Sequence, residues 1–258
     1  MPKSPQQNEG IVAATLRTIV PALFIALVIR TVLFQLVSIP SGSMKPALLI
    51  GDYLVVSKFT YGYSRYSLPF GPPLLSGRVF GAQPNRGDIV VFRSPTDDSS
   101  DLIKRTIGLP GDRIEVRGGL LHINGTPVKR ERIADFVGED ACQQMPMFDV
   151  VGRVPRWRET LPNGVSYDTV ECPLVATDID PDNTQVYHVP AAHFFMMGDN
   201  RHNSMDSRFL NEVGYVPFEN LIGRAQVVFF SVAEGVNAWE VWRWPGSVRW
   251  GRLGTVVR

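Results

Sequence analysis

A long apolar segment near the N-terminus, IVAATLRTIVPALFIALVIRTVLFQLV from Ile11 to Val37, most constrains what this chain can fold into. A helix that spans a bilayer needs about 20 apolar residues. Arg17 and Arg30 shorten the uncharged run, but side chains of this length reach the membrane surface from within a span. Pro21 lies in the first turns, where a helix accepts it. The segment therefore predicts one membrane anchor, with the rest of the chain folded outside the bilayer.

A cleaved signal peptide is the alternative interpretation, since the uncharged centre has about the length of a signal-peptide core. The residues that follow, SIPSGSM, lack the Ala-x-Ala-like end of a cleavage site, which favours an uncleaved anchor. Lys3 and Arg17 precede the uncharged centre and Lys45 and Lys58 follow it, so the positive-inside rule gives little preference for either orientation.

Composition narrows the class of protein. Hydrophobic residues make up 44% of the 258 residues and charged residues 20%, which is typical of a globular domain. The net charge of +1, without a basic block interleaved with aromatics, argues against nucleic-acid binding. Cys142 and Cys172 lack CxxC spacing, which argues against a zinc site. They form a disulfide if this region is extracytoplasmic, or else two buried thiols.

Beyond the apolar segment, short strands and turns dominate the pattern. Gly-Asp pairs introduce GDYLVV at Gly51, GDIVVF at Gly87 and GDRIEV at Gly111, and each predicts a turn followed by a strand. LLHINGTPV predicts a hairpin at Asn-Gly, and AQVVFFSV predicts a buried strand. The fold class expected is mainly β: a single transmembrane helix and a mostly antiparallel β domain with an inserted β-rich subdomain.

The strand pattern weakens between about Glu131 and Pro190, which indicates an insertion in the main domain. We expect a tail and anchor at 1–38, a main β domain at 39–112 and 190–258, and the inserted subdomain at 113–189. The C-terminal part, NAWEVWRWPGSVRWGRLG, mixes tryptophan with arginine. That mixture suits a membrane–water interface and equally suits ordinary packing of aromatics on the β core.

The first motif that suggests chemistry is IPSGSMKPALLIGD, which places Ser41 and Ser43 directly after the apolar segment. Ser-Gly-Ser is common turn material, so this motif alone predicts only a turn. A nucleophilic serine needs a base, most often histidine. His202 lies in the polar segment GDNRHNSMDSR, and a triad with Asp199 or Asp206 can be drawn, although no GxSxG motif supports it.

Lysine is the other candidate base. DLIKRTIGLPGD places Lys104 at the end of an apolar strand, where burial would lower the pKa of the ammonium and produce a usable base. The alternative is a lysine that faces water, with Arg105 on the opposite face of the strand. A metal site from His188, His193 and Asp199 can also be drawn, but these residues match neither helical spacing nor a known ligand pattern.

Four segments in order, IPSGSMKPALLIGD, RGDIVVFRSP, DLIKRTIGLPGD and GDNRHNSMDSR, closely resemble the motifs of bacterial type I signal peptidases, the leader peptidases. Each motif alone is moderately specific, whereas four in order behind an apolar segment are very specific. The resemblance covers the anchor and most of the β domain, and the insertion only loosely. It implies a membrane-bound serine endopeptidase that cleaves signal peptides from exported preproteins after small residues, without cofactor or metal.

The resemblance also implies a role for each matching residue. Ser43 matches the nucleophile and Lys104 the general base of a Ser-Lys dyad. Ser204 matches the hydroxyl that orients the lysine, and Ser41 with the Ser43 backbone N–H matches the oxyanion hole. The substrate is expected to lie extended between the strands of Ile39 and Ile103. The other matches are the supporting residues Asp199, Arg201, Asp206 and Arg208, and the pocket walls Ile39, Met44, Leu48 and Ile103.

With one span, the resemblance implies a protein of the bacterial inner membrane with a cytoplasmic N-terminus and an extracytoplasmic catalytic domain. Its partners are signal peptides and membrane lipid. His202 departs from the family, which usually has an acidic residue there, and this puts a local charge contact in doubt. The family often has a disulfide in the insertion, but Cys142 and Cys172 are widely spaced, so their pairing stays open.

Two other functions stay open. One is a specialised processing peptidase with a narrow client, such as a pilus or conjugation protein, although the full-length β domain and insertion favour the general role. The other is a catalytically silent, membrane-tethered β module that binds extended peptides. Ser43, Lys104 and Ser204 together argue against that module, because a binder needs none of the three.

Overall fold

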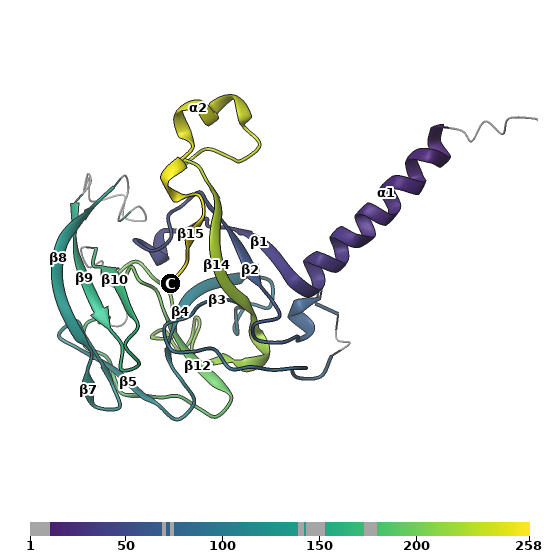
Figure 1. Ribbon diagram of the computed structural model, residues 1–258. Coiled ribbons are helices and arrows are strands. Elements are labelled where there is room, and N and C mark those ends of the chain that lie inside the picture. The colour runs from purple at the N-terminus through teal and green to yellow at the C-terminus, as the bar shows by residue number, and fades with distance from the viewer. Residues whose placement is uncertain (1–10, 69–70, 73–74, 139–141, 143–152, 173–179) are drawn as a thin grey trace, which may run out of the picture.

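The computed structural model describes residues 11–68, 71–72, 75–138, 142, 153–172 and 180–258. Helix α1 (Ile11–Val28) continues into a π-helical turn, η1 (Ile29–Leu33), and projects away from the β-rich part (Figure 1). Within the described residues, Thr15–Leu33 is the one helical segment long and apolar enough to cross a membrane, with a mean hydropathy of 2.0. The expectation of a single apolar helix is confirmed.

The helix ends earlier than the apolar run in the sequence, because Phe34–Ser38 form strand β1. The sequence FQLVS alternates exposed and half-buried positions, which is the period of a strand. Along its whole length β1 pairs with β2 (Asp52–Ser57). The expected anchor limit at residue 38 is therefore corrected to Leu33, and these five residues belong to the sheet.

The main sheet is antiparallel, with eight strands in the order β1-β2-β14-β3-β4-β12-β13 and β15 paired to β14. This confirms the mainly β, mostly antiparallel fold expected from the turn pattern. Gly51, Gly87 and Gly111 have φ values of 87°, 98° and 89°, a left-handed region that glycine enters without steric cost. Each of the three Gly-Asp turns precedes a strand, as predicted. The remaining strands of this sheet are β3 (Ile89–Arg93), β4 (Asp101–Gly108), β12 (His193–Met197), β13 (Val216–Pro217), β14 (Leu221–Ser231) and β15 (Thr255–Val256).

Two smaller sheets lie within the range expected for the insertion. One has the order β11-β5-β6-β7 and the other β10-β9-β8, which Figure 1 shows as a separate curved sheet at the side of the molecule. The predicted hairpin is confirmed, with Asn124 and Gly125 at φ values of 56° and 82° in its turn. The strands are β5 (Arg113–Arg117), β6 (Leu120–Ile123), β7 (Thr126–Pro127), β8 (Lys129–Val137), β9 (Arg153–Thr160), β10 (Ser166–Val170) and β11 (Tyr187–His188).

The insertion packs on the main sheet through a shared apolar core. Ile107 of β4 and Phe195 of β12 lie in one buried cluster with Ile114 of β5, Leu121 of β6 and Tyr167 of β10. Buried apolar area stabilises a fold by roughly 25 cal/mol per Å². The inserted strands are therefore fixed against the strand that carries Lys104.

Cys142 and Cys172 form a disulfide, which decides between the two alternatives left by the sequence. In Figure 1 the C-terminal segment forms a lobe above the sheet. Short helices make up part of this lobe: η5 (Val241–Arg243), α2 (Trp244–Ser247) and η6 (Trp250–Arg252). We call residues 239–252 the tryptophan lobe.

The tryptophan lobe contains one tryptophan that packs on the β core and three that are exposed, so both alternatives considered from the sequence occur. Trp244 packs on Phe230, with ring centroids 4.9 Å apart. Trp239, Trp242 and Trp250 are 70%, 71% and 65% exposed. Ordinary packing therefore accounts for one of the four, and three face outward.

Candidate active site

Ser43 lies in the turn between β1 and β2, on a single 3₁₀ turn, η2 (Gly42–Met44). Residues 41–45 are called the Ser43 turn below. Met44 beneath it is fully buried, and its carbonyl accepts a hydrogen bond of 2.9 Å from the Leu48 N–H. Ser43 itself is 7% exposed. The apolar residues that follow the serine thus fix the turn to the core and leave its hydroxyl near the surface.

Lys104 lies in the middle of β4, not at the end of a strand as the sequence suggested, and pairs across the sheet with Val90. Its Nζ donates a hydrogen bond of 2.6 Å to Ser43 Oγ. The lysine is 4% exposed. Burial lowers the pKa of Lys104 to about 8, with Asp206 opposing this change and Arg208 adding to it. The interpretation of a solvent-facing lysine is therefore wrong, and the structure brings Ser43 and Lys104 together.

Two hydrogen-bond donors lie next to the Ser43 hydroxyl. Ser41 Oγ is 3.4 Å from Ser43 Oγ. Among the residues that the structure describes, the Ser43 backbone N–H has no acceptor. Both donors are thus available to an oxygen that develops negative charge next to Ser43.

The polar segment GDNRHNSMDSR forms a loop behind the Ser43 turn, and residues 198–208 are called the support loop. Asp206 accepts two hydrogen bonds of 2.9 Å from Arg208 and one of 3.0 Å from the Gly198 N–H. Burial alone would raise the pKa of Asp206, but Arg208 outweighs it and the pKa is lowered. The Asp206–Arg208 ion pair expected from the resemblance is present in the structure.

Asp199 of the support loop pairs with Arg105 of β4. The guanidinium donates two hydrogen bonds, of 2.8 and 2.7 Å, to the carboxylate, and both side chains are buried. Arg201, placed by the sequence in the same supporting role, pairs instead with Glu159 of the inserted strand β9. Neither Arg105 nor Glu159 was predicted to contribute to the site.

Ser204 does not make the contact that the resemblance implies. Its hydroxyl is buried and makes no hydrogen bond to Lys104 within the described part of the chain, and it acts instead on the Asp206 carboxylate, whose pKa it helps to lower. Ser204 lies against Gly198, where a Cβ would overlap the serine side chain and come within 2.6 Å of the Ser43 carbonyl oxygen. Glycine is therefore required where the support loop meets the Ser43 turn. The orienting role of Ser204 stays a prediction.

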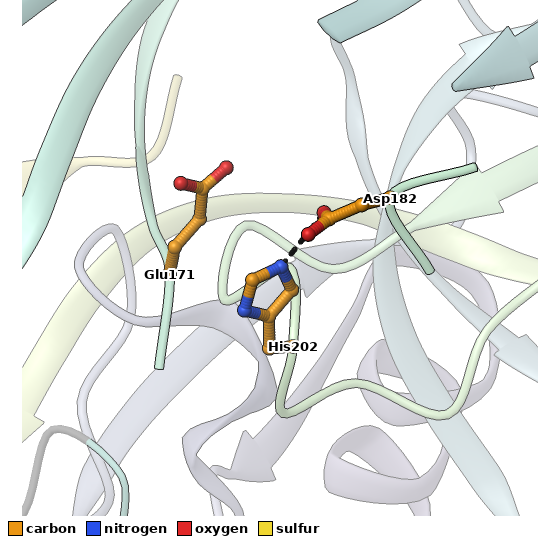
Figure 2. Close-up of side chains that lie close together, drawn as sticks. All are labelled: Glu171, Asp182 and His202. Atoms are coloured by element: carbon orange, nitrogen blue, oxygen red, sulfur yellow. Dashed lines mark hydrogen bonds and ion pairs between the residues drawn. The ribbon is translucent and has the colours of Figure 1, made fainter. Parts of the chain in front are cut away.

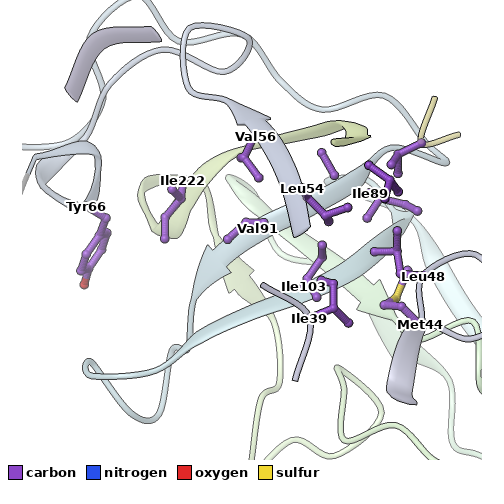
Figure 3. Close-up of a cluster of buried hydrophobic side chains, with 13 residues drawn as sticks. Ile39, Met44, Leu48, Leu54, Val56, Tyr66, Ile89, Val91, Ile103 and Ile222 are labelled. Atoms are coloured by element: carbon purple, nitrogen blue, oxygen red, sulfur yellow. The ribbon is translucent and has the colours of Figure 1, made fainter. Parts of the chain in front are cut away.

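The four residues expected to line substrate pockets lie in one buried cluster, in which Figure 3 labels all four. Met44 and Leu48 are fully buried, and Ile39 nearly so. Ile103 is 9% exposed. The structure brings these residues together, and their role as pocket walls stays a prediction.

Asn200 is a site residue that sequence reasoning did not single out. Its backbone N–H donates a hydrogen bond of 3.0 Å to the Ser43 carbonyl, and its side-chain amide donates one of 3.2 Å to the Gly42 carbonyl. Asn200 thus bonds the peptide units on both sides of Ser43, and the first of these carries the Ser43 N–H. Its place among charged neighbours in a polar loop was the available signal, but a loop sequence does not reveal which peptide it bonds.

The histidine alternatives do not form. His202 contacts the Asp182 carboxylate through Nε2 at 2.9 Å (Figure 2). Its Nδ1 contacts the Cys172 carbonyl at 2.5 Å, so neither nitrogen is available to Ser43. The candidate triad partners Asp199 and Asp206 are paired with arginines.

One side-chain cluster has the spacing of metal ligands. Glu171, Asp182 and His202 offer ligand atoms within 4.8 Å of one another (Figure 2). However, Glu171 is ion-paired with Arg130 and accepts a hydrogen bond of 3.1 Å from Trp157 Nε1. Both of its oxygens are therefore engaged by protein groups, and we interpret this cluster as packing around the support loop. His188 and His193, drawn as ligands from the sequence, do not belong to it.

Comparison with known proteins identifies the family. A family model described as signal peptidase, peptidase S26, matches residues 12–230. Signal peptidase I of Rickettsia typhi is 43% identical over 212 residues, which is 80% of this chain and 76% of that relative. Signal peptidase I of Rickettsia prowazekii is 42% identical over 212 residues, with the same shares. A crystal structure of a signal peptidase I from Enterococcus faecalis shares 28% identity, covers 55% of this chain and 97% of that chain, and has a TM-score of 0.30. The family model and the relatives show that the chain belongs to the signal peptidase family, peptidase S26, and is a serine peptidase.

Proposed function

We propose that this chain is a membrane-anchored endopeptidase that removes signal peptides from exported preproteins, with Ser43 as nucleophile and Lys104 as general base. The observation that carries the proposal is the contact of 2.6 Å between Lys104 Nζ and Ser43 Oγ. Burial lowers the pKa of this lysine to about 8, so a neutral amine is accessible near physiological pH. In that state the Ser43 O–H donates to the amine lone pair.

The reaction follows from these positions. Lys104 takes the Ser43 proton while Oγ attacks the scissile carbonyl, and the oxyanion is stabilised by the Ser43 N–H and Ser41 Oγ. Lys104 then returns the proton to the leaving amine, which leaves an acyl-enzyme on Ser43. Water, deprotonated by the same amine, hydrolyses the ester and restores the serine.

The edge of β4 supports binding of an extended substrate. β4 pairs with β3 over Ile89–Arg93, but β12 pairs with β4 only from Arg105 onward. On the β12 side, the described residues leave Asp101–Lys104 without a strand partner. A peptide strand added there would form backbone hydrogen bonds with β4 and contact Ile103. Ile39 lies in the same cluster as Ile103, so the two line this path together.

We infer that the protein lies in the bacterial inner membrane, with its N-terminus in the cytoplasm and its β domain on the extracytoplasmic side, as the family resemblance implies for a single span. Two features support the membrane location. Helix α1 has the length and hydropathy of a single span. Trp239, Trp242 and Trp250 are exposed on the tryptophan lobe, and tryptophan favours the membrane–water interface. Membrane lipid is thus a proposed partner of helix α1 and of the tryptophan lobe.

Lipid contact by the lobe is tested in proteoliposomes with brominated lipids, which quench tryptophan fluorescence on contact. Trp239→Ser combined with Trp242→Ser should remove most of the quenching, and unchanged quenching would exclude lipid contact by the lobe.

The proposal is tested by cleavage of a purified preprotein with the full chain and with its Ser43→Ala and Lys104→Ala variants. We expect one cut after a small residue, identified by mass spectrometry of the mature product, and no measurable cutting by either variant. Circular dichroism checks that the variants are folded. Undiminished cutting by either variant would refute the mechanism. Binding without cutting by the unmodified chain would indicate a peptide-binding module, and cutting of one client from a panel of preproteins would indicate a specialised peptidase.

A further inference from the structure

The support loop is bonded on its two sides to different parts of the molecule. Backbone groups of successive residues in an extended chain point in opposite directions. The Asn200 N–H points to the Ser43 carbonyl. On the opposite side, the Asp199 carbonyl accepts from the Val170 N–H at 3.0 Å, and the Arg201 N–H donates to the Val170 carbonyl at 2.9 Å. Asn200 therefore forms a single-residue bridge between the Ser43 turn and the end of β10 in the inserted sheet.

The Arg201 side chain enters the inserted sheet and is buried there. Its Nη2 donates to Glu159 Oε2 at 2.5 Å and contacts Tyr167 Oη at 3.0 Å. Tyr167 Oη in turn donates to the same Glu159 oxygen at 2.8 Å. Burial alone would lower the pKa of Arg201, but Glu159 and Tyr167 outweigh it and the pKa is raised. A buried guanidinium that loses its carboxylate becomes an uncompensated charge, so this contact determines where Arg201 lies.

Glu159 also faces an arginine on the neighbouring strand of the inserted sheet, at ion-pair distance but without a hydrogen bond. Its second oxygen, Oε1, is 3.9 Å from Arg130 Nε on β8. Arg130 stacks on the Trp157 ring at 4.2 Å and pairs with Glu171. Alternating acids and bases thus cross β8 and β9 and end on Arg201. Next to Arg201, His202 contacts Asp182, as Figure 2 shows, and also the Cys172 carbonyl.

We propose that Glu159 and Tyr167 are positioning residues for peptide-bond cleavage. They fix Arg201, Arg201 fixes the adjacent Asn200 peptide, and Asn200 fixes the Ser43 turn. The inserted sheet, which touches neither Ser43 nor Lys104 through these residues, is thereby a part of the cleavage machinery. This inference rests on the proposed function for its kinetic consequence and on the contacts alone for its structural consequence.

Kinetics of the full chain test the first consequence. Glu159→Gln keeps the shape of the side chain and removes its charge, and Tyr167→Phe removes one hydroxyl while the ring remains. We expect kcat to fall about 10- to 100-fold in Glu159→Gln and about 3- to 10-fold in Tyr167→Phe, with KM changed less than about threefold, because misplaced reacting groups slow the chemical step. The matched control is Glu131→Gln on β8, whose side chain is 55% exposed. Its kcat should stay within about twofold of the unmodified chain.

Amide hydrogen exchange tests the second consequence without any need for activity. In Glu159→Gln the Asn200 and Arg201 amides should exchange at least about tenfold faster, while amides of β3 and β14 keep their rates. Unchanged exchange at these two amides would overturn the inference. Equal acceleration everywhere would also overturn it, because it would show general destabilisation. Tyr167→Phe repeats the measurement if Glu159→Gln does not fold. An unmodified chain that cuts no preprotein would refute the proposed function and leave the exchange result standing.

Discussion

Lys104 and Arg105 are neighbours on β4 and are both buried, but they lie on opposite faces of the strand and differ in their contacts and in their pKa shifts. Arg105 makes two hydrogen bonds to Asp199 and lies 4.2 Å from the Tyr167 ring centroid. Asp199 more than offsets burial, so the pKa of Arg105 is raised. Lys104 contacts a hydroxyl, and burial lowers its pKa to about 8. One face therefore carries a permanent cation and the other a base.

The difference shows that burial alone does not make a base. A guanidinium remains protonated in proteins, whereas an ammonium group loses its proton when it is desolvated without a carboxylate in contact. The kind of cationic group and the position of the carboxylate together separate a structural cation from a reactive amine. Each prediction below changes one side of this comparison.

The largest loss of cleavage is expected when Lys104 is replaced by arginine, the residue type of its neighbour Arg105. Lys104→Arg keeps the charge but cannot accept the Ser43 proton, so preprotein cleavage should fall by about 10⁴-fold or more. Lys58→Arg is the matched control. Lys58 is also buried, and burial lowers its pKa to about 8, but its Nζ donates to the Ser67 carbonyl. The control should cut within about threefold of the unmodified chain if folded, and Lys104→Arg with more than about 1% activity would contradict the comparison.

The next effect comes from removal of the carboxylate on the other face. Asp199→Asn leaves the Arg105 guanidinium buried without a counter-charge, which should reduce the free energy of unfolding by about 3–5 kcal/mol. Asp168→Asn provides the control, because its partner Arg158 has 52% of its side chain exposed and such pairs contribute at most about 1 kcal/mol. Urea denaturation followed by circular dichroism measures both. Equal losses for the two variants would show that the buried pair has no special importance.

The pH dependence of cleavage tests the Lys104 side directly. The folded pKa of about 8 lies below the ordinary 10.5, so the neutral fraction of Lys104 falls as pH drops below 8. We expect kcat/KM to decline by about 50-fold between pH 8 and pH 6, with a slope that approaches about tenfold per pH unit well below the pKa. Arg105 remains charged throughout this range and contributes nothing to the slope. A profile that is flat down to pH 6 would rule out Lys104 as the base.

The smallest effect is a gain in stability when the base is removed. Below pH 8 Lys104 is protonated in both the folded and unfolded states, and its burial has its full cost of about 3 kcal/mol. Loss of the hydrogen bond to Ser43 offsets roughly 1 kcal/mol. Lys104→Met should therefore be inactive but about 2 kcal/mol more stable at pH 7, with the gain fading as pH rises from 8 to 10.5. Denaturation at pH 7 and pH 10 measures this, and a variant less stable at pH 7 would contradict the assigned desolvation.

Much of the fold could be predicted because its signals are local. Each Gly-Asp pair and the Asn-Gly hairpin determine a turn within a few residues, and the strands follow. The end of the helix was misplaced because the apolar run continues into β1, and the change of period covers only Phe34–Ser38. The resemblance named Ser43 and Lys104, and the structure brings them together.

The buried ion pairs behind the site could not be predicted from the sequence, because their partners lie far apart along the chain. Arg201 and Glu159 are 42 residues apart, and Arg105 and Asp199 are 94 apart. Side-chain pairing over such separations depends on how whole strands stack. Turn composition and strand period carry no information about it. The same applies to the bond between Asn200 and the Ser43 turn.

The contact between the Asn200 side chain and the Gly42 carbonyl joins residues 158 positions apart. A ribosome therefore releases the nucleophile long before it releases the segment that fixes it. Domains fold as units once enough of the chain has emerged. Until residues 198–208 leave the ribosome, a nascent chain contains Ser43 without the hydrogen bonds from Asn200 that position its turn. The peptidase therefore becomes competent only after the support loop has been synthesised.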